Sequence, residues 1–211
     1  MWTVFTNIGD AAVTLPVAAI CAGWIALFDV RLACRWIVVL AAGMAVVGAT
    51  KILYFGWGLS LAASGLRVVS GHTMLSTAVW IVAIGLQLKW WRLPPLLGIV
   101  AGMVVGVLTG VARVMDHSHS LPEVLSGWVL GALVAAVFLR SALKVEFDRP
   151  RPFWSAISLL LVSTLAYGHK APLQDLIEAH AAEIHRHAPS VAALFHPIRY
   201  RTQSQVVAPA R

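Results

Sequence analysis

The sequence predicts an all-α integral membrane protein, a six-helix bundle with a short amphipathic C-terminal tail. Of the 211 residues, 59% are hydrophobic and 12% are charged, whereas soluble domains are about half apolar and about a quarter charged. The chain also offers six apolar runs near the length of about 20 residues with which a helix crosses a bilayer. We therefore expect residues 1–168 to form the transmembrane bundle and residues 169–211 to form the tail.

The six apolar runs follow one another with short polar connections. The predicted spans are 11–28, 36–57, 71–88, 96–112, 121–139 and 153–168, the last being the shortest. Pro95 and Pro122 stand at the starts of the fourth and fifth spans, because proline is tolerated in the first turn of a helix. The fourth span has a glycine at every fourth position, which favours close helix packing rather than phosphate binding. These glycines are Gly98, Gly102, Gly106 and Gly110.

The basic residues predict the orientation of the bundle. The loops after the first, third and fifth spans hold two, two and four Lys or Arg residues, whereas the loops after the second and fourth hold only Arg67 and Arg113. The positive-inside rule places the first set in the cytoplasm. The net charge of +7 is thereby explained without nucleic acid. Residues 1–10 carry no positive segment, so no cleavable signal peptide is expected.

In the tail, apolar residues recur at helical spacing between Pro172 and His187. This pattern predicts an amphipathic helix that lies on the membrane or on the bundle. His180, Glu183 and His187 share one face of it, which fits solvated side chains better than a metal site. Residues 199–211 are expected to be disordered.

A polar segment, RVMDHSHSLPE at residues 113–123, lies between two of the apolar spans. Arg113 offers a fork of donors that favours phosphate or carboxylate. His119 and Glu123 offer a nucleophile or base and a carboxylate able to orient it. Because two membrane crossings separate residue 72 from residue 113, His72 is expected at the same membrane face.

Lys51 and the segment Ser70-Gly71-His72 are also expected at this face. An ionisable residue at membrane depth is a functional candidate, although the stem of Lys51 is also long enough for its ammonium to reach the surface. Ser70 fits an ordinary N-cap. The same helix start also fits an anion site, because its free N–H groups and positive dipole end attract phosphate.

The polar segment has structural alternatives too. Ser120 and Glu123 fit a capping box, in which each satisfies a backbone donor of the other, but this leaves Arg113 unexplained. Asp116 and His117 fit solvated loop residues. A metal site that includes them is disfavoured, because the ligand sets do not match known ones.

In combination these residues resemble the type-2 phosphatidic acid phosphatase superfamily, which also includes the vanadium haloperoxidases. The family pattern is K-x6-R-P, then P-S-G-H, then S-R-x5-H-x3-D. Here Lys51, Ser70-Gly71-His72 and Arg113-x5-His119-x3-Glu123 match in order and spacing. The opening segment 8–16 also looks like the start of bacterial members, and the resemblance covers roughly residues 5–140.

The resemblance implies a phosphatase that needs no metal and no cofactor and acts through a phosphohistidine. In that mechanism His119 attacks phosphorus, Glu123 holds its imidazole and His72 protonates the leaving oxygen. The groups implied to bind the phosphoryl oxygens are Lys51, Ser70, the Gly71 N–H and Arg113. Fixed cations and N–H groups of this kind stabilise the charge that develops in the transition state.

Some positions depart from the family pattern. Gly58 stands in the place of the arginine of the first motif, and Leu59 in the place of its proline. Arg67 would either bind the same oxygens or serve as a loop cation. Glu123 replaces an aspartate, and its added methylene displaces the carboxylate far enough to affect positioning.

The expected protein is a multi-pass lipid phosphatase of the bacterial inner membrane, with its site on the periplasmic face. Its substrate would be a phosphomonoester or pyrophosphate on a lipid whose apolar tails stay in the bilayer. Two alternatives remain open: a lipid phosphotransferase, and a lipid-phosphate-binding protein with little or no catalysis. A transporter would need ionisable residues near mid-membrane, and none is evident.

Overall fold

The computed structural model describes residues 2–57, 66–147 and 151–169, and these residues form an all-helical fold. The helices are α1 (Thr3–Ile8), α2 (Ala11–Ala26), α3 (Val30–Trp57), α4 (Gly71–Trp90), α5 (Pro95–Met115), α6 (Leu121–Ala142) and α7 (Pro152–Ala166). The predicted tail helix, the predicted disordered end, Gly58 and Leu59 lie outside the described residues.

Each of the six predicted spans corresponds to one helix, α2 to α7, and the short α1 was not predicted. Within the described residues, α3, α4, α5 and α6 are long and apolar enough to cross a membrane. α2 and α7 are apolar but have only 16 and 15 residues, fewer than the about 20 that a full crossing needs. The all-α membrane class is thus supported, and the count of six spans stays a prediction.

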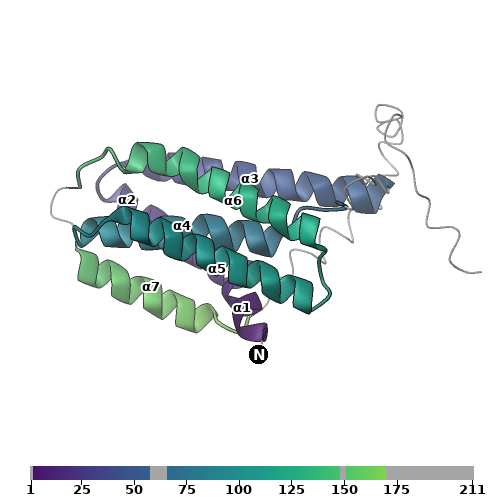
Figure 1. Cartoon of the computed structure of the whole chain (residues 1–211). Coiled ribbons are helices and arrows are strands. Elements are labelled where there is room, and N and C mark those ends of the chain that lie inside the picture. The colour runs from purple at the N-terminus through teal and green to yellow at the C-terminus, as the bar shows by residue number, and fades with distance from the viewer. Residues whose placement is uncertain (1, 58–65, 148–150, 170–211) are drawn as a thin grey trace, which may run out of the picture.

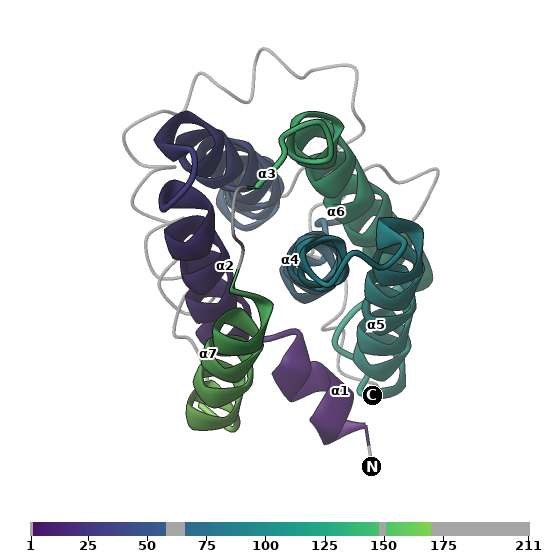
Figure 2. The same ribbon diagram turned by 90° about the vertical axis from the view of Figure 1, so that its left-hand side faces the viewer.

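α4 lies at the centre of the bundle, with α2, α3, α5, α6 and α7 around it (Figure 2). Its buried hydroxyl groups are satisfied by neighbours: Ser76 Oγ lies 2.9 Å from Thr109 Oγ1 of α5, and Thr77 Oγ1 donates to the Thr73 carbonyl at 2.7 Å. A polar side chain that is hydrogen-bonded in this way does not incur the full cost of burial. The first turns of α4 are therefore held firmly in place.

The glycines of α5 let it approach the α4 backbone closely. A Cβ at Gly98 would lie 2.7 Å from Gly85 Cα, and one at Gly102 would overlap the backbone of Ile81. A Cβ at Gly106 would overlap the Thr77 side chain. The prediction of small-residue packing is confirmed, and any larger side chain at these positions would push α5 away from α4.

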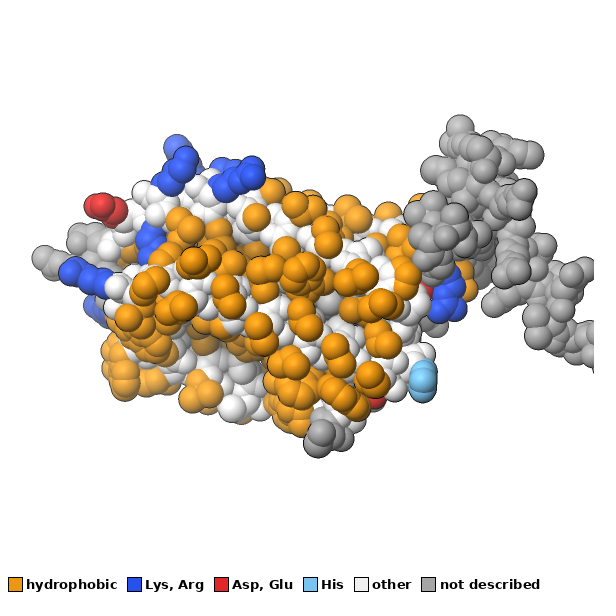
Figure 3. All heavy atoms as spheres, viewed as in Figure 1, with side chains coloured by type: hydrophobic (Ala, Val, Ile, Leu, Met, Phe, Trp, Pro, Cys, Tyr) orange, Lys and Arg blue, Asp and Glu red, His pale blue; other side chains and the backbone are white. Residues whose placement is uncertain are grey.

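The two ends of the bundle differ in chemistry. The connections from α2 to α3 and from α4 to α5 lie at one end, together with the end of α6, and the start of α4, the end of α5 and the start of α6 lie at the other (Figure 1). Blue Lys and Arg side chains gather mainly at the first end, and a broad hydrophobic surface separates it from the second (Figure 3). At the basic end Lys89 Nζ donates to the carbonyls of Ala142, Leu143 and Val145 at 2.8, 2.8 and 2.6 Å, and so caps α6.

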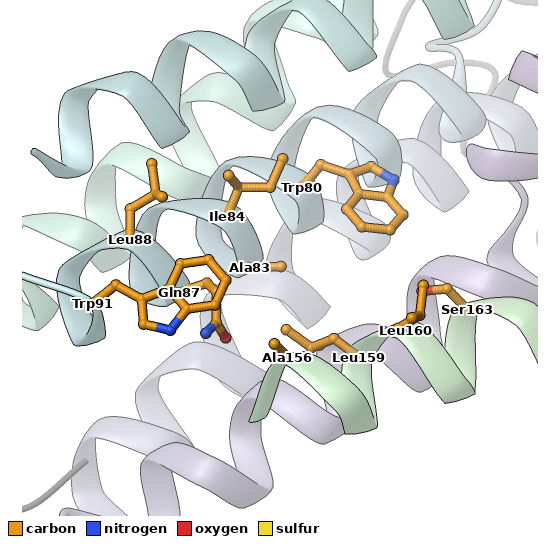
Figure 4. Close-up of a pocket in the computed structure, with 10 residues that line it drawn as sticks. All are labelled: Trp80, Ala83, Ile84, Gln87, Leu88, Trp91, Ala156, Leu159, Leu160 and Ser163. Atoms are coloured by element: carbon orange, nitrogen blue, oxygen red, sulfur yellow. The ribbon is translucent and has the colours of Figure 1, made fainter. Parts of the chain in front are cut away.

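Two apolar cavities lie along the helices. One, of about 310 Å³, lies between α4 and α7 and includes Trp80, Gln87 and Leu160 (Figure 4). The other, of about 380 Å³, lies between α5 and α6 and includes Val114 and Trp128. Neither is lined by any of the predicted site residues.

Candidate active site

The predicted polar residues come from helix ends that meet at the end of the bundle opposite the basic loops (Figure 1). Ser70 precedes α4 and His72 lies in its first turn. Arg113 lies in the last turn of α5, and Glu123 in the first turn of α6. The α5–α6 connection carries His119 between them. The structure thus brings these residues to one end of the bundle, as expected from the two crossings between residues 72 and 113.

His119 and Glu123 form a buried pair. His119 Nδ1 lies 2.8 Å from Glu123 Oε2, and only 7% of the His119 side chain and 1% of the Glu123 side chain are exposed. The same oxygen accepts the Ser120 N–H at 3.1 Å. Glu123 Oε2 therefore contacts His119 and the N–H at the start of α6 at once, so a capping role does not exclude the pairing with His119. The added methylene relative to aspartate does not prevent the contact with His119.

Arg67 lies against the same carboxylate. Its Nε donates to Glu123 Oε1 at 3.1 Å, while 53% of its side chain stays exposed. The hydrogen bond and the charge of Glu123 raise the pKa of Arg67. The sequence left Arg67 as a phosphate ligand or a loop cation, and the structure adds a third role, as a partner of Glu123.

The start of α4 is tied to the start of α6. The Ser70 N–H donates to the Glu123 carbonyl at 3.0 Å, and the fully buried Ser70 Oγ lies 3.0 Å from Thr73 Oγ1. Gly127 packs so closely on Ser70 that a Cβ there would lie 2.5 Å from the Ser70 carbonyl oxygen. Because the first N–H groups of a helix have no partner within it, the Gly71 N–H is a suitable donor for an anion.

Two cations act on His119. Lys51, on α3, is 8% exposed, and the Arg113 Nε is buried with no hydrogen-bond acceptor among the described residues. Burial lowers the pKa of His119 most, and the charges of Arg113 and Lys51 lower it further, whereas the hydrogen bond that His119 donates to Glu123 raises it. Burial and the two positive charges therefore favour the neutral form of His119.

His72 has a carboxylate partner that the sequence reasoning missed. Its Nε2 lies 3.3 Å from Asp10 Oδ2. Asp10 is the N-cap of α2, and its Oδ1 accepts the Ala12 N–H at 2.8 Å. An aspartate just before the first apolar run was the available signal, since it is a typical helix start, but nothing in the sequence connects it with His72.

The exposed loop residues were predicted to be solvated. Asp116 accepts a hydrogen bond from Thr6 Oγ1 at 3.1 Å, which attaches the loop to α1. His117 is exposed and has a φ of 52°. Asp116 thus has a structural contact, and His117 fits the solvated role.

The chain matches the model of the PAP2 superfamily over residues 53–142. This range includes Ser70, His72, Arg113, His119 and Glu123. No solved structure matches the chain significantly. An "Uncharacterized 22.5 kDa protein in cps region" of Klebsiella pneumoniae is 30% identical over 191 residues, which cover 83% of this chain and 88% of that protein. The chain therefore belongs to the PAP2 superfamily, as the spacing of its motifs predicts.

Proposed function

We propose that the protein is a metal-independent lipid phosphate phosphatase, which hydrolyses a phosphomonoester or pyrophosphate on a lipid headgroup. The observation that carries the proposal is the buried His119–Glu123 pair, set beside cations at one end of a bundle of apolar helices. Membership of the PAP2 superfamily supports a phosphatase of the membrane type.

In the first step His119 acts as the nucleophile. Its Nδ1 is engaged by Glu123, so the lone pair on Nε2 forms the bond to phosphorus. The bond from phosphorus to the lipid oxygen breaks, and its electron pair goes to that oxygen, which takes a proton from His72. The histidine attached to phosphorus becomes positively charged, and the buried Glu123 carboxylate stabilises it.

In the second step water resolves the phosphohistidine. Neutral His72 takes a proton from the water as its oxygen attacks phosphorus. The phosphorus–nitrogen bond breaks and its electron pair returns to His119 Nε2. Inorganic phosphate leaves, and both histidines are restored to their starting states.

The phosphoryl oxygens would be bound by groups from three helix ends. Lys51 and Arg113 supply positive charge, and Ser70 with the Gly71 N–H supplies donors at the start of α4. Arg67 would add its terminal guanidinium nitrogens while its Nε stays on Glu123. Charges and donors that are fixed before the reaction stabilise the transition state without reorganisation.

The proposed location is the bacterial inner membrane, with the site on the periplasmic face. The bacterial relative and the apolar helices support a bacterial membrane protein. Basic side chains gather at the end opposite the site (Figure 3), and such residues favour the cytoplasmic side. The lipid tails would stay in the bilayer while the headgroup enters the site from the side.

A phosphate-release assay on the purified protein tests the proposal. The panel holds phosphatidic acid, phosphatidylglycerol phosphate, a polyprenyl pyrophosphate and phosphorylated lipid A. We expect release from at least one lipid, loss of release in His119→Asn, and full release in His117→Asn, an exposed control in the same loop. Full activity of His119→Asn would reject the mechanism.

The same assay separates the alternatives. A labelled phosphoryl group recovered on a second lipid would identify a phosphotransferase. Binding of the lipids without turnover, lost in Arg113→Ala, would identify a lipid-phosphate-binding protein, a reading motivated by Gly58 and Glu123 in place of the family's arginine and aspartate.

A further inference from the structure

We propose that Asp10 is a positioning residue for His72, so that the site operates with two histidine–carboxylate pairs, one for the nucleophile and one for the proton donor. The inference rests on the proposed function. It starts from the contact of 3.3 Å between Asp10 Oδ2 and His72 Nε2. Asp10 lies outside residues 53–142, the range that matches the family model.

The Asp10 carboxylate is held in place from its own side. Its Oδ1 accepts the Ala12 N–H at 2.8 Å, and its backbone carbonyl accepts from Thr14 Oγ1 at 2.9 Å. The residue is 8% exposed. Because one oxygen is committed to the cap of α2, the other is directed at His72 with little freedom to turn.

The segment before Asp10 is fastened to the helices that carry the site. The Ile8 carbonyl accepts from Trp80 Nε1 of α4 at 3.3 Å, and the Phe5 carbonyl accepts from Thr109 Oγ1 of α5 at 3.4 Å. A Cβ at Gly9 would overlap the Thr109 side chain and lie 3.3 Å from the His72 carbonyl oxygen. The absence of a side chain at Gly9 thus lets the chain reach His72.

The pairing fixes which nitrogen of His72 meets the substrate. With Nε2–H donating to Asp10, Nδ1 is the nitrogen that gives its proton to the leaving oxygen. After that transfer His72 is neutral, Nε2–H stays on Asp10, and the lone pair on Nδ1 can take the proton from water in the second step. A carboxylate that selects a tautomer and stabilises the imidazolium does the same work in other triads.

Asp10→Asn is the informative variant. The amide oxygen of asparagine can still cap α2, and its NH2 group then faces His72. Because NH2 is a donor, it cannot accept a hydrogen bond from a proton on Nε2. Proton donation matters for a lipid alkoxide, which is a poor leaving group, and little for p-nitrophenolate, which leaves without a proton. A residue that only stabilises the fold would affect both substrates alike.

We therefore compare phosphatidic acid and p-nitrophenyl phosphate in detergent micelles. For Asp10→Asn we expect kcat on phosphatidic acid to fall about 100-fold or more, the lower end of general-acid effects, with KM little changed and p-nitrophenyl phosphate hydrolysis largely retained. His72→Gln should show the same selectivity, and the double variant should be no worse than His72→Gln alone. Serine can also cap a helix, so Asp10→Ser should likewise lose more activity on phosphatidic acid than on p-nitrophenyl phosphate.

The matched control is Asp29→Asn. Asp29 is an acidic residue at the opposite end of the bundle, and its Oδ1 accepts the Leu32 N–H at 3.0 Å in the first turn of α3. Asp29→Asn should leave the activity on both substrates unchanged. Suppose that His72→Gln shows the expected selectivity. The inference is then overturned if Asp10→Asn loses activity equally on both substrates, or if Asp10→Ser keeps full activity on phosphatidic acid. Failure of the unmodified protein on every lipid of the panel would instead overturn the proposed function.

Discussion

Glu123 and Asp10 illustrate how single carboxylates can serve two needs in an apolar protein. Each uses side-chain oxygens for a backbone N–H at the start of a helix and for a histidine nitrogen. A buried charge is costly unless it is paired and hydrogen-bonded. At Glu123 the Arg67 guanidinium supplies the countercharge, and the extra methylene relative to aspartate still allows the contact with His119.

The surroundings of His119 predict the pH dependence of the reaction. The pKa of His119 is lowered from its ordinary value of 6.5 by burial and by Arg113 and Lys51. Because the neutral form attacks, the rate should rise with pH through a midpoint below that value. Lys51→Met removes one positive charge, so the rising limb should move to higher pH.

The pH profile of kcat/KM measures this shift, with Lys144→Met at the opposite end of the bundle as the control. A rising limb that stays in place or moves to lower pH in Lys51→Met would contradict the electrostatic account of His119. A flat profile between pH 5 and 9 would require a different acid or base.

The contacts that the sequence predicted are those between residues that lie nearby in the chain. Glu123 is one helical turn after His119, so spacing alone suggested their contact. The contact between Asp10 and His72 spans 62 positions, and that between Arg67 and Glu123 spans 56. Such contacts depend on how helices pack, which a single sequence does not reveal.

At the scale of elements, the close approach of α4 and α5 depends on glycine. Gly102→Ala would place a Cβ against the backbone of Ile81, and forcing extra volume into a packed interior costs about 1–3 kcal/mol. Gly48→Ala, on α3, meets nothing within 4 Å and should be neutral or stabilise by about 0.5–1 kcal/mol, because alanine favours a helix.

Thermal unfolding in one detergent checks this pair of variants. We expect a lower melting temperature for Gly102→Ala and an unchanged or higher one for Gly48→Ala. Equal melting temperatures would mean that α4 and α5 are not packed as tightly as described.

Helix starts that are marked by a serine cap or a proline were easier to predict than helix ends. Spans predicted at 71 and 121 begin at Gly71 and Leu121, because a serine cap and proline mark those places. α5 continues to Met115 and α6 to Ala142, three residues beyond the predicted ends. α3 begins at Val30 rather than at 36, since Arg31 and Arg35 are exposed and their charge does not oppose a helix. An apolar run indicates the part of a helix that suits the membrane interior, and the helix itself can extend beyond that run.

For the whole molecule, the separation of basic loops from the site predicts the orientation in the membrane. Ser118 is exposed in the site loop, and Lys144 is exposed at the basic end. In a Cys34→Ser background the remaining Cys21 is buried. Ser118→Cys should react with a membrane-impermeant maleimide on spheroplasts, and Lys144→Cys should react only after lysis. The reverse pattern would put the site on the cytoplasmic face.

The central claim, that one phosphoryl group passes through His119, is tested most directly by trapping the enzyme during turnover. The protein is mixed rapidly with a hydrolysed lipid phosphate, quenched in base and digested, and the peptides are examined by mass spectrometry. The account predicts an acid-labile phosphate on His119, absent from His119→Asn. Phosphate on another residue, or turnover that persists in His119→Asn, would contradict it.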